Sequence, residues 1–144
     1  GPGTDMAVSC REGTTGVPLT VEILNRATGN LLATINAGGG DQITYDAARN
    51  RYYLAASRWT ASGTSSGPAC TAASPCTPVL QIIDAGTRTL IKTVHTGNNA
   101  HSVGVDSAHG EVYLPFSSAS SPAGCSDCST GDPIGNGGVL VFED

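Results

Sequence analysis

An internal repeat with an offset of about sixty residues is the feature that most constrains the fold of this chain. Residues 22–36 read EILNRATGNLLATIN and align with residues 81–95, QIIDAGTRTLIKTVH. After one inserted residue the match resumes, with ITYDAARNRYYLA at 43–55 against VGVDSAHGEVYLP at 103–115. Because the match covers apolar strands and polar turns alike, it predicts a piece of a repeat-built, all-β protein such as a propeller.

The repeat predicts propeller blades of four short antiparallel strands each, which we call A to D. The series is B-C-D, A-B-C-D, A-B-C, or about two and a half blades of an incomplete ring. The expected strands are B at 6–10, C and D within 22–36, A at 42–46, B at 51–57, C at 79–84, D at 90–95, A at 101–106, B at 111–117 and C at 138–143. The corresponding segments are a tag remnant or linker at 1–5, a partial blade at 6–41, a complete blade at 42–96 with a long loop at 58–78, and a partial blade at 97–144 with a long loop at 117–137.

The amino-acid composition agrees with short strands and argues against a helical, nucleic-acid-binding or membrane-spanning protein. Gly, Thr, Ser and Ala are abundant, whereas the helix-favouring residues Lys, Glu and Leu are scarce. The net charge is -5 and no Lys/Arg cluster occurs, which argues against nucleic-acid binding. No run of about eighteen apolar residues suggests a membrane span. The opening Gly1-Pro2 resembles the remnant of a cleaved expression tag.

The stretch from Val79 to Leu114 resembles the YVTN-type (lactonase-like) β-propeller repeat. Those repeats combine an "ID…T…V…TI" hairpin, a Gly-rich link with Pro-His, and a "V.V…G..VYV" hairpin. The resemblance covers most of 20–57 and 79–118, and it implies a seven-bladed propeller whose blades are lengthened here by the long loops. Two positions depart from the pattern, because Ala100 stands where Pro usually precedes His101, and Asp41 replaces the His of the earlier repeat.

Two and a half blades leave open sheets, so we expect the remaining propeller blades to lie in the same or another chain. The favoured explanation is that this chain is a fragment. The other is a homo-oligomer that completes the ring, although the surplus B and C strands at the two ends would compete for one slot.

Strand order predicts which end of the blades carries a binding site. Successive strands are antiparallel, so the A–B and C–D turns share one face, while the B–C loops and D–A links share the other. Long loops on a rigid scaffold are the usual place for binding, so we expect a site at the second face, near the mouth of the central channel. The candidate ligand-binding residues there are Asp41, Gln42, Trp59, Asn98, Asn99 and His101. Trp59 is either an exposed binding anchor or a cap on the core between blades.

Asp41 and His101 open equivalent strands of adjacent blades, and two roles are open to them. Imidazole and carboxylate groups are suitable ligands for a divalent metal, Ca or Zn, at the channel mouth. The alternative, which we favour, is that His101 braces adjacent blades by hydrogen bonding. Two ligands are too few to close a metal site, so the others would come from missing blades.

All five cysteines lie in loops rich in Ser, Gly and Pro, which favours an oxidising compartment and an extracellular or periplasmic protein. We expect two local disulfides, Cys70–Cys76 and Cys125–Cys128. A shared Cys₄ zinc site and a redox C-x-x-C are the alternatives, and Cys10 is left over.

Three functions remain open on this evidence. The first is an exported binding module that recognises a protein or small ligand through its cysteine-braced B–C loops. The second is a metal-dependent lactonase- or lyase-like enzyme whose axial site is completed by missing blades. The third is a structural or surface-layer role. No nucleophile elbow, phosphate loop or zinc-protease motif is present in the sequence.

Overall fold

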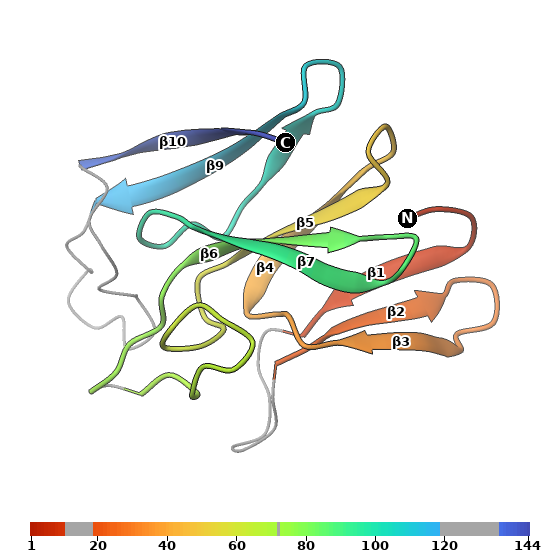
Figure 1. The fold of residues 1–144 in the computed structure, drawn as a ribbon, viewed down its shortest axis with the longest axis horizontal. Coiled ribbons are helices and arrows are strands. Elements are labelled where there is room, and N and C mark those ends of the chain that lie inside the picture. Colours follow the sequence, from red (N-terminus) through yellow and green to blue (C-terminus); the bar gives the residue numbers. More distant parts are fainter. Residues whose placement is uncertain (11–18, 72, 119–135) are drawn as a thin grey trace.

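The computed structural model describes residues 1–10, 19–71, 73–118 and 136–144, and within these ranges the chain is all-β and contains no helix. Ten strands form three separate antiparallel sheets (Figure 1). The strands are β1 Asp5–Ser9, β2 Val21–Asn25, β3 Leu31–Ile35, β4 Gly40–Asp46, β5 Arg51–Ala56, β6 Val79–Asp84, β7 Thr89–His95, β8 Gly104–Asp106, β9 Glu111–Ser118 and β10 Asn136–Glu143.

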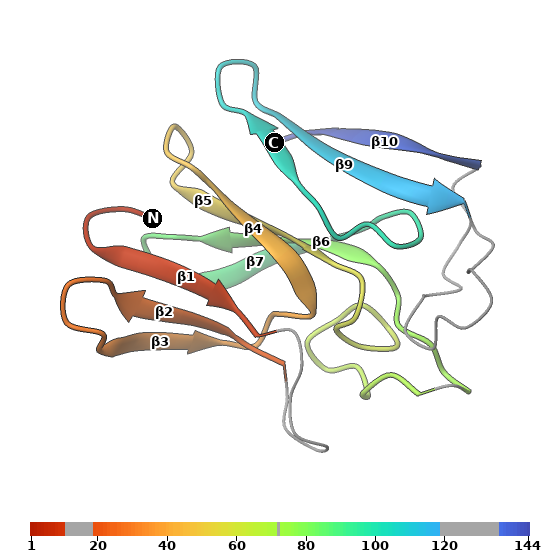
Figure 2. The ribbon, with the colours of Figure 1, turned by 180° about the vertical axis from the view of Figure 1, so that it is seen from behind.

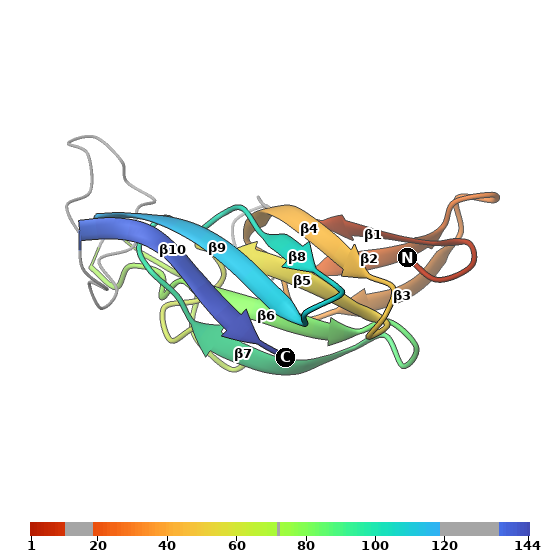
Figure 3. The ribbon, with the colours of Figure 1, turned by 90° about the horizontal axis from the view of Figure 1, so that it is seen from above.

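The pairing of the strands confirms the expected series of ten. The first sheet has the order β1-β2-β3, the second β4-β5-β6-β7, and the third β10-β9-β8. These orders correspond to B-C-D, A-B-C-D and A-B-C. The four-stranded sheet lies between the two three-stranded sheets, which Figure 1 shows on opposite sides of it, and Figure 3 shows the stack from above. None of the sheets closes on itself.

The middle strands of the central sheet, β5 and β6, are buried on both faces, because successive side chains of a strand point to opposite faces of the sheet. Tyr52, Leu54 and Ala56 pack in a core shared with the first sheet. Tyr53 and Ala55 point the other way, into a core shared with the third sheet. All five residues are at most 2% exposed. The near-continuous apolar run of this strand therefore reflects burial from both sides.

The four hairpin turns that the structure describes share one local device. Each begins on an Asn or Asp whose side-chain oxygen accepts hydrogen bonds from main-chain N–H groups two or three residues later, which fixes the turn. Four residues after it, the chain takes a positive φ between +53° and +80°. The Asn and Asp residues are Asn25, Asp46, Asp84 and Asp106, and the positive-φ residues are Gly29, Asn50, Arg88 and Gly110.

One strand is shorter than the sequence predicts. The strand expected at 101–106 begins only at Gly104. Before that point, the main-chain groups of Val103 are hydrogen bonded to side chains of β4. Its N–H donates to Gln42 Oε1 at 3.0 Å, and its carbonyl accepts from Thr44 Oγ1 at 3.1 Å. These bonds tie the third sheet to the second instead of extending β8.

The two ends of the stacked sheets differ in character, as Figures 1 and 2 show. The tight hairpin turns lie at one end, and the connections 36–39, 57–78 and 96–103 lie at the other. This separation of turns from loops and links is the one predicted from strand order. It divides the candidate functional groups into a loop end and a hairpin end, which we describe in turn.

Candidate functional site

At the loop end, the connection from the first sheet to the second is a glycine run held against the base of the long loop. Gly39 has a φ of +75°, and a Cβ there would lie only 2.5 Å from the main-chain carbon of Arg58. Its carbonyl accepts the N–H of Arg58 at 3.0 Å, and the neighbouring Gly38 N–H donates to the buried Gln81 Oε1 at 2.8 Å. Only glycine permits this approach, and it fixes Asp41 beside the start of loop 57–78.

The connection from the second sheet to the third repeats this arrangement. A Cβ on Gly97 would lie 2.3 Å from the Phe116 ring, so the link packs flat on that side chain. The carbonyl of Asn98 accepts the Ser117 N–H at 2.9 Å, just as Gly39 accepts from Arg58. Each link is thereby hydrogen bonded to the end of the second strand of the sheet that it enters.

The two links bring Asp41 and His101 together. Asp41 Oδ2 lies 3.5 Å from His101 Nδ1, although the residues are sixty positions apart in sequence. Their side chains are 37% and 44% exposed, so both can still meet solvent or a ligand. Gln42 follows Asp41 on β4 and is also exposed, and its amide oxygen is already used by Val103. The loop end therefore presents a carboxylate, an imidazole and an amide side by side.

The other predicted ligand-binding residues lie deeper. Trp59 is 4% exposed and packs in the core between the first and second sheets. Of its two expected roles, the structure bears out the core cap and not the exposed anchor, because the tight link at Gly39 turns the start of the loop inward. Asn98 is 1% exposed, and Asn99 is half-buried with a φ of +54°. These three residues therefore support the loop end from inside and expose little side-chain surface to a ligand.

Loop 57–78 is braced by the predicted disulfide between Cys70 and Cys76, which is present with a Cα–Cα distance of 5.0 Å. Within it, Thr71 and Ser74 exchange two main-chain hydrogen bonds of 2.9 and 3.1 Å. The base of the loop is closed where Thr77 N–H donates to the Thr60 carbonyl at 3.0 Å. The disulfide is compatible with an oxidising compartment. Cys10 is a free, half-buried thiol, and the predicted Cys125–Cys128 pair lies outside the described residues.

Asp41 and His101 by themselves do not make a metal site. Structural zinc takes four ligands and calcium six to eight, whereas these residues supply two. In the described part of the chain, no third His, Cys, Asp or Glu groups with them closely enough to share an ion. The bracing role expected for His101 fits the observed contact, and any metal there needs ligands from beyond the described residues.

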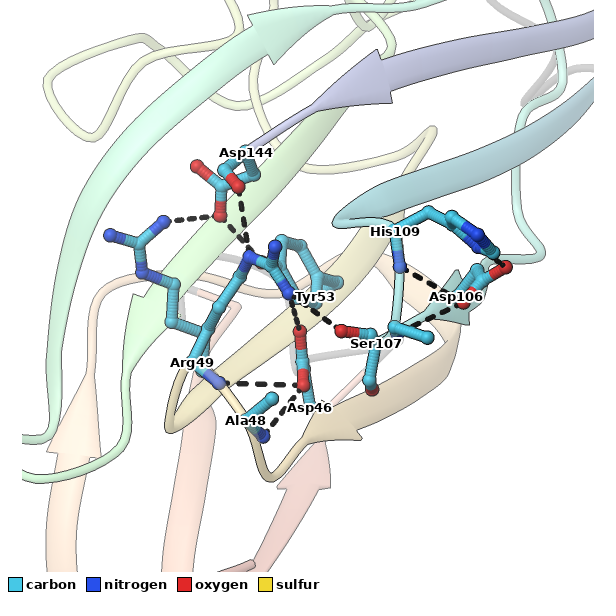
Figure 4. Close-up of polar contacts among 10 residues, drawn as sticks. Asp46, Ala48, Arg49, Tyr53, Asp106, Ser107, His109 and Asp144 are labelled. Carbon is cyan, nitrogen blue, oxygen red and sulfur yellow. Dashed lines mark hydrogen bonds and ion pairs between the residues drawn. The ribbon is translucent and has the colours of Figure 1, made fainter.

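The hairpin end carries a charged network that sequence reasoning missed, because it treated these turns as purely structural (Figure 4). Asp46 is 1% exposed and accepts hydrogen bonds from Ala48 N–H and from Arg49. Arg49 also donates to the carbonyl of Ser107 at 3.1 Å, in the turn of the next sheet. Burial opposes ionisation of Asp46, but hydrogen bonds from Ser107, Ala48 and Arg49 outweigh it and lower the pKa of this carboxyl.

Asp144, which follows β10, joins this network from the other side. Its carboxylate accepts hydrogen bonds from Arg51 and from Tyr53 Oη, and its carbonyl accepts from Arg49 Nε at 2.8 Å. Burial works against the charge, yet the bonds from Arg51 and Tyr53 lower the pKa of Asp144. Burial and the neighbouring carboxylate raise the pKa of Tyr53, which keeps its hydroxyl a donor. The network therefore locks the second and third sheets together.

A third group of charges lies on the β8–β9 turn. His109 Nδ1 is 2.7 Å from Asp106 Oδ2, and this hydrogen bond raises the pKa of His109 and lowers that of Asp106. Glu111 completes a set whose ligand atoms lie within 4.8 Å of one another. In the second sheet, Arg49 and Arg51 occupy the positions of His109 and Glu111, a difference that the repeat alignment reveals. The exposed His109 is already hydrogen bonded to Asp106, and the two form a surface ion pair when the imidazole is protonated.

One groove, of about 320 Å³, lies between the outer strands of the second and third sheets. Its apolar walls include Leu80, Ile82, Val94 and Phe142, and none of the predicted ligand-binding residues lines it. Within the described ranges no helix is long and apolar enough to cross a membrane. Neither the protein-family models nor the curated proteins give a match to this chain.

Proposed function

We propose that this chain is part of an exported, propeller-type binding module that recognises a protein or small ligand at its loop end. The sheets would be successive blades, with strands in the order that the YVTN-type resemblance implies. Three features support the proposal: the repeat, the stacking of three antiparallel sheets, and the gathering of links and long loops at one end.

The observation that carries the proposal is the contrast between the two ends. At the hairpin end, the carboxylates of the buried Asp46 and of Asp144 already accept hydrogen bonds from arginine side chains within the protein. At the loop end, the Asp41 and His101 side chains stay more than a third exposed on links held rigid by glycine contacts, beside a disulfide-braced loop. Exposed polar groups on a fixed backbone lose little conformational entropy on binding, which is the property of a preorganised site.

The test is a search for ligands with a readout that locates them. A library of small polar fragments and short peptides would be screened by ¹⁵N–¹H correlation spectra of the 144-residue chain. Ligands are expected to shift amide signals of residues 41–42, 57–71, 73–78 and 96–101. The double variant Asp41→Asn, His101→Gln should lose these shifts, while the matched hairpin-end variant His109→Gln should keep them. Shifts confined to the hairpin end would overturn the proposal.

A second candidate is a metal-dependent lactonase- or lyase-like enzyme, favoured by the 3.5 Å approach of Asp41 to His101. In that case the two side chains would be part of a ligand set completed by further blades. Elemental analysis of the purified protein discriminates between the two candidates. Zinc or calcium that is lost in His101→Ala supports the enzyme, whereas metal-free protein that still binds fragments supports the binding module.

A further inference from the structure

Large apolar side chains are exposed on the outer faces of both three-stranded sheets. On the third sheet, Val139 and Val141 of β10 are 57% and 52% exposed. On the first sheet, Met6 and Val8 of β1 are 42% and 38% exposed. Monomeric proteins seldom leave whole sheet faces of this kind open to water. Figure 1 places these two sheets on opposite sides of the central one, so the two faces point away from each other.

The strand register shows which residues of the other two sheets are equivalent to those on the outer face of the third sheet. Val139 pairs with Pro115 and Val141 with Tyr113, as Leu80 pairs with Ala55 and Ile82 with Tyr53 in the second sheet. The positions of Val139 and Val141 are thus those of Leu80 and Ile82, and of Val21 and Ile23 in the first sheet. Those four equivalents are at most 3% exposed, because each packs on the sheet that follows.

The outer face of the first sheet is the complementary half of the same contact. Met6 pairs with Leu24 and Val8 with Glu22, as Tyr52 pairs with Ile83 and Leu54 with Gln81. Met6 and Val8 therefore hold the positions of Tyr52 and Leu54, and of Val112 and Leu114 in the third sheet. These equivalents are at most 2% exposed, because each packs on the sheet that precedes it.

We propose that the outer face of the third sheet binds the outer face of the first sheet of a second copy of this chain. The chain already makes this kind of contact twice, between its first and second and between its second and third sheets. The second copy repeats it a third time, and both halves of the contact are present on one chain. This surface is distinct from the loop end, so the inference does not depend on the proposed function.

Such a contact is head-to-tail, because it joins two different faces. It extends from copy to copy until rotation closes a ring. Face-to-face stacking leaves every sheet with its own strands, so the two incomplete sheets do not compete for one strand position. Glu22, a charged residue on the first-sheet face, is already held by hydrogen bonds from the hydroxyls of Thr20 and Thr34 at 2.9 and 2.8 Å. Part of the hydrogen-bonding capacity of the Glu22 carboxylate is therefore already used within the chain before the contact forms.

Sedimentation equilibrium over a concentration series from about 10 µM to about 1 mM tests the proposal. The mass of the wild-type chain should rise from 14.5 kDa toward multiples of it. Val141→Lys and Val8→Lys each remove one face, and each should weaken association by at least about tenfold. The control is Ile91→Lys, because Ile91 is 49% exposed and lies at a bulge of the edge strand β7, outside both faces.

A mixture of the two face variants separates the head-to-tail arrangement from all others. Val141→Lys keeps an intact first-sheet face and Val8→Lys keeps an intact third-sheet face, so an equimolar mixture should give a one-to-one dimer that grows no further. Circular dichroism confirms that each variant is folded. A wild-type chain that stays at 14.5 kDa throughout, or a mixture that stays monomeric while wild type associates, would overturn the proposal.

Discussion

Arg49 Nε donates a hydrogen bond of 2.8 Å to the carbonyl of Asp144, a residue 95 positions further along the chain. The same guanidinium group contacts the carboxylate of Asp46 at 3.3 Å and the carbonyl of Ser107 at 3.1 Å. One side chain in a tight turn therefore connects three segments from two sheets. This makes it the best single probe of how the second and third sheets hold together.

Arg49→Met should destabilise the fold by about 1–3 kcal/mol, because it leaves a buried carboxylate without its charged donor while keeping the aliphatic stem. Asp46 is 1% exposed, so water replaces the lost bonds poorly. Urea unfolding measures the change in free energy. The matched control is Arg26→Met in the β2–β3 turn, where the arginine is exposed. Equal losses in both variants would contradict the role assigned to Arg49.

Acid should weaken the fold through Asp46. Its pKa is lower in the folded state than the ordinary value of 3.8, so its contribution to stability is fully present above the unfolded value. That contribution is lost as the pH falls through the folded pKa, in a window that begins near about pH 4. Urea midpoints measured down to about pH 2 should decline steeply for wild type and less steeply for Asp46→Asn. Parallel pH profiles for the two proteins would refute this assignment.

The repeat allowed the strands, their pairing order and the separation of turns from loops to be predicted from sequence. The apolar run of β5 and the Asn or Asp at the start of each hairpin are local signals, and their recurrence along the repeat reinforces them. The contact between Asp41 and His101 followed from the same reasoning, since equivalent links of adjacent sheets must lie side by side.

The hairpin-end network could not be predicted in this way. Asp46, Ser107 and Asp144 are far apart in sequence, and only the stacking of two sheets brings them together. The replacement of Arg49 by His109 between repeats was the available signal, because a charge that differs at one position of a repeat needs a different partner. The burial of Trp59 likewise depends on a tertiary contact, the close approach of Gly39 to the loop.

The disulfide should act locally. The double variant Cys70→Ser, Cys76→Ser opens a loop of only a few residues, so the free energy of unfolding should fall by about 2 kcal/mol or less. The amides of Thr71 and Ser74, which exchange hydrogen bonds inside this loop, should lose most of their protection against hydrogen exchange. Cys10→Ser controls for the loss of a thiol elsewhere. Unchanged protection at both amides would show that hydrogen bonds alone hold the loop.

Gly39 and Gly29 offer a matched pair for testing whether tight link packing positions Asp41. Their φ values are nearly equal, at +75° and +74°, so alanine costs each position a similar conformational strain of about 1 kcal/mol. A Cβ at Gly29 meets nothing within 4 Å, whereas one at Gly39 would overlap the main chain of Arg58 and Trp59. Gly39→Ala should therefore destabilise by about 2 kcal/mol more than Gly29→Ala and should shift the ring signals of His101, because Asp41 moves with the link. Equal unfolding free energies, or His101 signals that stay in place, would show that the link tolerates the added carbon and that Asp41 is held by other contacts.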